Sequence, residues 1–201
     1  MPEFHDRILV WDCPALRAKG EWTAQRPAVF EQVYRSDQGV IEWSCLQPQS
    51  SVRICAGDVL LEGPGYAEQL HMTLPPWSMP IDELRWGRFV TAGDAIVWIQ
   101  WHGAHRTEIA YENGHRIAAV RIADDGIELE SGTTLAFEHA AVLRQGTLGS
   151  TALAGIPGLS KAVPARILRV LECKWLSRAK LLRNGSIDSS GWAIHEVVRW
   201  P

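Results

Sequence analysis

Short segments in which apolar and polar residues alternate follow one another along most of this chain, and they restrict its fold more than any other feature. Examples are Val40–Leu46, Tyr66–Thr73 and Asp94–His102. Turn signals separate the segments. The clearest is Glu112-Asn113-Gly114, because Asn-Gly tolerates the positive φ of a tight hairpin. About ten such strands without a convincing long helix predict an all-β fold, an antiparallel barrel or sandwich.

The length of 201 residues, 46% of them hydrophobic, suits a single β-rich domain over residues 1–201. Residues 1–27 carry scattered prolines and a glycine, which predict an irregular N-terminal arm. Residues 146–164 are rich in glycine, alanine and leucine and predict a loop or a short helical lid. Residues 167–182 fit a helix and a strand about equally well, so both assignments stay open.

Charge and composition exclude several classes of protein. The net charge of −3 and the lack of a long lysine or arginine run argue against a nucleic-acid partner. The N-terminus has no apolar signal core, and no apolar run approaches the roughly 20 residues that span a bilayer. The four cysteines at 13, 45, 55 and 173 lack zinc or redox spacing. We expect a cytoplasmic protein with free thiols and with neither metal nor cofactor.

Ten tryptophans are an unusual number for a chain of this length. Most of them lie inside alternating segments, where large flat rings fill a pleated surface well. One interpretation is a core of bulky side chains. The other is that several rings line a cavity for an apolar ligand, since aromatic walls with a few polar groups are typical of such sites.

Residues 63–89 contain most of the functional signal. Residues two apart on a strand share a face, so Tyr66, Glu68, Leu70 and Met72 point the same way. If that face is the barrel interior, desolvation favours a protonated Glu68, which makes it a candidate acid. The alternative is an ion pair that holds the carboxylate ionised. Its partner would come from the neighbouring strand, as either Arg85 or Arg88, which have opposite parity.

Other candidates for chemistry are weaker. Glu196 shares a face with apolar residues of the last strand and is a candidate second buried carboxylate. His102 and His105 flank Gly103, but no third ligand has a usable spacing, so a surface loop is predicted there rather than a metal site. No nucleophile elbow, phosphate loop or dinucleotide fingerprint occurs.

Three elements together resemble the carotenoid 1,2-hydratase (hydroxyneurosporene synthase) and AttH-like superfamily. They are Gly63-x-Gly65-Tyr66-x-Glu68, then Leu84-Arg-Trp-Gly-Arg-Phe89, then Val97-Trp98. The resemblance covers roughly Val40–Trp101. It implies a lipocalin-like (calycin) β-barrel with an apolar, often isoprenoid, ligand inside.

In the hydratases of that superfamily the tyrosine and the acid of the motif are proposed to act at a carbon–carbon double bond. The resemblance therefore implies Tyr66 and Glu68 as the catalytic pair and places Trp43 where an active-site tryptophan lies upstream. Two departures are visible: glutamate stands where the hydratases have aspartate, and Ile41 or Glu42 stands where they have a histidine. The chain is also shorter than the two-barrel relatives and would supply one barrel.

These observations lead to an expected function. The barrel binds an apolar molecule such as an isoprenoid or polyene and carries out acid-assisted hydration, isomerisation or cyclisation of an alkene without a cofactor. The expected ligand-binding residues are Trp43, Trp86, Trp98, Arg88 and Met72. The first alternative is a non-catalytic lipocalin-like binding protein for small hydrophobic molecules. A second is an open sheet completed by another copy of the chain, a homodimer.

Overall fold

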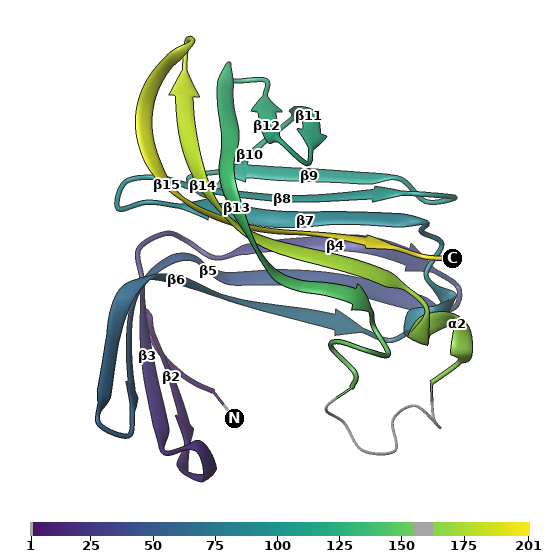
Figure 1. The fold of residues 1–201 in the computed structure, drawn as a ribbon, viewed down its shortest axis with the longest axis horizontal. Coiled ribbons are helices and arrows are strands. Elements are labelled where there is room, and N and C mark those ends of the chain that lie inside the picture. Colours follow the sequence, from purple (N-terminus) through teal and green to yellow (C-terminus); the bar gives the residue numbers. More distant parts are fainter. Residues whose placement is uncertain (1, 155–162) are drawn as a thin grey trace.

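The structure, a computed structural model, describes residues 2–154 and 163–201. Over these residues nearly all regular structure is β-strand, arranged in one six-stranded and one nine-stranded antiparallel sheet. The two sheets form a nearly closed antiparallel barrel (Figure 1). The all-β antiparallel fold predicted from the alternating segments is therefore confirmed. No helix in the described part of the chain is long and apolar enough to cross a membrane.

The first sheet has the order β1-β2-β3-β5-β4, and β6 also pairs with β5. Its strands are β1 (Glu3–His5), β2 (Ile8–Cys13), β3 (Ala18–Ala24), β4 (Val29–Ser36), β5 (Gly39–Ala56) and β6 (Val59–Met72). The long hairpin β5–β6 turns at Gly57, whose φ of 57° lies in the left-handed region that favours glycine. Its distal half, with β2 and β3, extends away from the rest of the fold (Figure 1).

The second sheet has the order β10-β9-β8-β7-β15-β14-β13-β12-β11. Its strands are β7 (Glu83–Val90), β8 (Ala95–His102), β9 (Thr107–Glu112), β10 (His115–Ile117), β11 (Ala119–Ala123), β12 (Gly126–Leu129), β13 (Thr133–Thr147), β14 (Leu171–Arg183) and β15 (Ser186–Arg199). The last strand, β15, inserts between β7 and β14 and joins the early and late parts of the chain. Short helices η1 (Pro14–Leu16), η2 (Pro76–Ser78) and α2 (Ala165–Leu168) interrupt the strands.

In two segments the structure differs from, or decides between, the expectations from the sequence, and it describes a third only in part. The irregular arm expected for residues 1–27 is wrong: most of it forms β1, β2 and β3, because β3 pairs along the distal half of β5. The ambiguous segment 167–182 is largely strand β14, preceded by α2. Of the loop or lid expected over 146–164, residues 155–162 lie outside the described residues.

Strands β7 and β8 are buried on both faces, so the core has two main parts. One face of β8 carries Val97, Ile99 and Trp101, which pack against β4 and β5 of the first sheet. The other face carries Ile96 and Trp98, which pack against β12–β15, where the second sheet folds over itself. A functional pocket between the sheets therefore has to lie on the first of these faces.

Gly87 in β7 lies under the ring of Trp98. A Cβ atom at this position would come within 2.3 Å of Trp98 Cζ2 and 2.8 Å of His195 Cβ. We expect Gly87→Ala to lower the free energy of unfolding by about 1–3 kcal/mol, because the packed ring has to shift. Urea unfolding measures the change. Gly93→Ala is the matched control, since its Cβ meets no atom within 4 Å; equal effects of the two variants would contradict the packing role.

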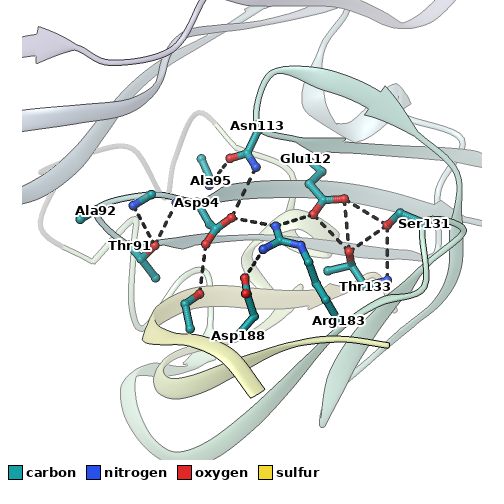
Figure 2. A network of polar contacts seen from close by, with 12 residues as sticks. Thr91, Ala92, Asp94, Ala95, Glu112, Asn113, Ser131, Thr133, Arg183 and Asp188 are labelled. Carbon is teal, nitrogen blue, oxygen red and sulfur yellow. Dashed lines mark hydrogen bonds and ion pairs between the residues drawn. The ribbon is translucent and has the colours of Figure 1, made fainter. Parts of the chain in front are cut away.

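Arg183, at the end of β14, joins three carboxylates (Figure 2). Its Nη2 donates to Asp94 Oδ1 at 2.8 Å and to Glu112 Oε1 at 2.9 Å, and its Nη1 pairs with Asp188. Burial alone would raise the pKa of Asp94, but hydrogen bonds from Arg183, Asn113 and other donors lower it. The network ties the β7–β8 turn and β9 to the β14–β15 hairpin, so these acidic groups have a structural role.

Candidate functional site

A pocket of about 300 Å³ lies between the two sheets. Its walls are mostly apolar and aromatic, with three charged side chains among them. The residues lining it come from β4, β5 and β6 on one side and from β7, β8, β14 and β15 on the other: Val33, Trp43, Tyr66, Glu68, Leu70, Leu84, Trp86, Ile99, Trp101, Lys174, Glu196 and Val198. Tyr66, Glu68 and Leu70 share a face of β6, as their alternation predicts.

Glu68 is held by two donors on a single oxygen. Trp43 Nε1 donates to Oε2 at 3.0 Å, and Arg88 Nη2 donates to the same atom at 2.6 Å. Of the two arginines considered from the sequence, Arg88 therefore contacts the carboxylate, while Arg85 pairs with Glu83 and Asp124. The expected position of the partner was wrong, because Arg88 reaches across the core from the other sheet rather than from a neighbouring strand.

Arg88 is only 1% exposed, and its charge has few other partners. Its guanidinium carbon lies 3.5 Å from the centre of the Tyr66 ring and 5.5 Å from that of Trp86. Its Nε and Nη1 atoms have no hydrogen-bond partner in the described part of the chain. One carboxylate and the negative faces of two rings thus compensate the buried cation.

Tyr66 and Cys45 complete the surroundings of Arg88. Burial raises the pKa of Tyr66, and the charge of Arg88 only partly opposes that rise. The phenol therefore stays neutral and can donate or accept a hydrogen bond. Burial also raises the pKa of Cys45 to about 11, although its sulfur lies 3.8 Å from Arg88 Nη2. A thiol with this pKa is a poor nucleophile at neutral pH.

A second group of charges lies on the β14–β15 side of the pocket. Lys174 Nζ is 3.0 Å from Glu196 Oε2, and Arg144 Nη2 donates to Glu196 Oε1 at 3.2 Å. The ammonium of Lys174 also lies 5.3 Å from the ring centre of Trp86. The side chain of Glu196 is 14% exposed, so it is largely buried, and it is paired with two cations.

The structure places the residues singled out from the sequence in different environments. Trp43 and Trp86 line the pocket together with Tyr66 and Glu68. Arg88 lies behind Glu68. Met72 packs against the core cluster beside the pocket, and Trp98 lies on the opposite face of β8, stacked on Phe137 with ring centres 5.8 Å apart.

Lys174 and Trp101 line the pocket but were not singled out from the sequence. Lys174 falls in the segment whose secondary structure stayed undecided, so its face could not be assigned. Trp101 alternates with buried Ile99 and Val97 along β8, and this pattern could have placed it on the inner face.

The two histidines near Gly103 have partners other than a metal. His105 Nε2 lies 3.2 Å from the carbonyl oxygen of Val33, and the ring packs edge-on against Tyr34. His102 Nε2 lies 2.9 Å from Gln100 Oε1. No group of three or more potential metal ligands occurs among residues 2–154 and 163–201.

No protein-family model matches the chain. No curated protein sequence matches it either.

Two solved structures are similar to this chain at low sequence identity. One is NE1406 from Nitrosomonas europaea, a candidate AttH, with 12% identity and a TM-score of 0.47; the match covers 100% of this chain and 64% of that one. The other is CghA, with 11% identity and a TM-score of 0.48, covering 96% of this chain and 64% of that one. The chain thus spans 64% of the length of each structure.

At this level of similarity neither structure assigns a ligand or an activity to the chain. Nothing in the comparisons supports the specificity of the carotenoid hydratases.

Proposed function

We propose that this protein binds an apolar small molecule in the pocket between its two sheets. The observation that carries the proposal is the composition of that pocket. Aromatic side chains of both sheets, among them Trp43, Trp86 and Trp101, surround a space of about 300 Å³ in which only a few polar groups are exposed. This combination is typical of sites for small apolar ligands.

The polar groups restrict the chemistry of the ligand. Two carboxylates, Glu68 and Glu196, line the pocket, whereas Arg88 lies behind Glu68 and Lys174 is paired with Glu196. Both donors to Glu68 bind Oε2, which leaves Oε1 as an acceptor. A ligand with a hydroxyl or amine group would satisfy this acceptor.

Acid-assisted hydration, isomerisation or cyclisation of an alkene is the second candidate function. Its support is that Tyr66 and Glu68 line the same aromatic pocket. Against it, Arg88 and Trp43 make contacts with Glu68 that stabilise a carboxylate, not a proton donor. Two cations also lie near the Trp86 ring, and their charge disfavours a carbocation there. Binding is therefore the better supported function.

Leu70→Arg tests the binding proposal. Leu70 is 55% exposed and lines the pocket, so an arginine there can be tolerated by the fold while it places a cation at the pocket. The probe is N-phenyl-1-naphthylamine, an apolar amine whose fluorescence rises on transfer from water. We expect its affinity to fall at least about tenfold, equivalent to about 1.4 kcal/mol.

Leu60→Arg is the matched control, because Leu60 lies on the same strand, is 49% exposed and does not line this pocket. It should leave the affinity unchanged. Equal affinities of the wild type and Leu70→Arg would overturn the assignment of the pocket.

The catalytic candidate needs a separate experiment. Native extraction and mass spectrometry of molecules that co-purify with the protein identify the ligand class. Turnover of that class is then compared between the wild type, Glu68→Gln and Tyr66→Phe. Unchanged turnover in Glu68→Gln would refute the acid role.

A further inference from the structure

We infer that the ligand site continues into a second apolar pocket, on the other face of β6, and that it takes an elongated apolar alcohol or amine whose polar group lies at Glu68. This inference rests on the proposed function and extends it to a class of ligand. The second pocket has a volume of about 610 Å³. It is lined by Pro2 and by residues of β1, β2, β3, β5 and β6: Phe4, Leu9, Trp11, Trp22, Leu46, Tyr66, Ala67, Glu68 and Gln69.

Tyr66 and Glu68 line both pockets. Alternation along β6 explains how the two spaces are arranged: Ala67 and Gln69 face away from Glu68 and line only the second pocket. The two pockets therefore lie on opposite faces of the strand and meet at Tyr66 and Glu68. Among residues 2–154 and 163–201, the two linings share these two residues alone.

The edge of β6 permits a connection between the pockets. Within the described residues β6 pairs with β5 only, so its other edge has no neighbouring strand along Val59–Met72. A molecule that passes around this edge would place one apolar part on each face of β6. Its hydrogen-bond donor would then lie beside the free Oε1 of Glu68.

The walls of the second pocket suit the second apolar part of such a ligand. Trp22 lies flat over Gly20, where an added Cβ would come within 2.4 Å of two ring atoms. An added Cβ at Gly65 would come within 2.2 Å of Val52 Cγ2 and 3.6 Å of Trp22 Nε1. Gly65, the second glycine of the Gly63-x-Gly65 element, therefore leaves room for the side chain of Val52 next to this pocket. Leu9, a further member of the lining, is only 6% exposed.

A series of straight-chain primary and mid-chain alcohols tests the inference. Their affinities are measured by displacement of N-phenyl-1-naphthylamine. In the wild type each added methylene should tighten binding about fourfold, until both pockets are filled. The reason is that burial of one methylene group away from water contributes about 0.8 kcal/mol. Mid-chain alcohols should bind more tightly than primary alcohols of the same length.

Gln69→Trp and Leu70→Arg separate the two pockets, because the residues are neighbours on opposite faces of β6. Gln69 is exposed and lines only the second pocket, so a tryptophan there fills it without burying a charge. We expect Gln69→Trp to remove the gain from longer chains and to leave short alcohols unaffected. Leu70→Arg should weaken the whole series.

If Gln69→Trp leaves the entire series unchanged, the second pocket is overturned and the proposed function stands. If no alcohol and no probe binds the wild type, the proposed function fails as well. Thermal unfolding checks that Gln69→Trp is folded.

A measurement on the wild type is independent of any variant. A long mid-chain alcohol with a diazirine at each end should label peptides from β2–β3 as well as peptides from β8 or β14. Labels confined to β8 and β14 would contradict the inference.

Discussion

Replacing Glu68 with leucine should destabilise the protein by about 3–5 kcal/mol, because it leaves the charge of Arg88 without an anion in a buried position. Arg88 is 1% exposed, and two of its nitrogens already lack hydrogen-bond partners in the described part of the chain. The ring of Tyr66 at 3.5 Å offers only partial compensation. Urea unfolding followed by far-UV circular dichroism measures the loss.

The double variant Glu68→Leu/Arg88→Met separates the ion pair from packing. It removes both charges and leaves mainly Trp43 Nε1 without an acceptor, so its stability should return to within about 2 kcal/mol of the wild type. Glu62→Leu is the control on the same strand, since the Glu62–Arg53 pair is exposed and should contribute less than about 1 kcal/mol. Equal losses in Glu68→Leu and Glu62→Leu would show that the Arg88 charge does not depend on Glu68.

This expectation affects how a catalytic test is interpreted. Glu68→Gln also removes the negative charge beside Arg88, so lost turnover can follow from lost structure. Turnover of Glu68→Gln must therefore be compared at a temperature where unfolding shows the variant to be native. Tyr66→Phe is informative because it keeps the ring against Arg88 and removes only the hydroxyl group.

The local alternation of apolar and polar residues, together with the turn residues, was sufficient to predict much of the fold. Alternation identified most strands and placed Tyr66 and Glu68 on one face of β6, and the family resemblance added Trp43 to the same site. The turn at Asn113-Gly114 was also predictable, since these residues have φ values of 54° and 86°, which Asn-Gly tolerates. These features depend on residues close together in the sequence.

The long strand β5 was harder to predict, because it contains irregular pairing. Its register with β6 shifts between Ser44 and Gln47 and again between Gln47 and Ser50. Each extra residue reverses the alternation, so the pattern over Val40–Leu46 does not continue unchanged along the whole strand. Gln49 is buried in this region and donates to the carbonyl oxygens of Thr91 and Ala92, a partnership that no local pattern reveals.

The candidate site was only partly predictable, since its main contact is long-range. The sequence limited the partner of Glu68 to Arg85 or Arg88. Arg88 lies opposite Ile194 of β15, and Arg85 lies opposite Val197. Residues opposite each other on paired strands share a face, so this pairing decides which of the two arginines faces the first sheet. Lys174 depends in the same way on the pairing of β14 with β15, where it lies opposite Glu196.

Acidification from about pH 6.5 to about pH 4 should lower the stability of the protein by up to about 3 kcal/mol through His195 alone. His195 is 5% exposed, stacks between Phe137 and Trp175, and shares a 2.8 Å hydrogen bond between its Nε2 and Ser177 Oγ. Burial lowers the pKa of its imidazole to about 4, from an ordinary value of 6.5. Between these values the unfolded chain binds the proton and the native protein does not, so stability falls as the pH falls.

The double variant His195→Phe/Ser177→Ala identifies this contribution. It keeps an aromatic ring between Phe137 and Trp175 and removes the titrating group together with the hydroxyl that would lose its partner. Urea unfolding at intervals from pH 7 to pH 4.5 should show a decline in the wild type that is much smaller in the variant. The range stops at pH 4.5 because Glu83 and Asp94, whose pKa values are lowered in the native protein, lose stabilisation at lower pH. Parallel declines in the two proteins would show that other groups control the acid sensitivity.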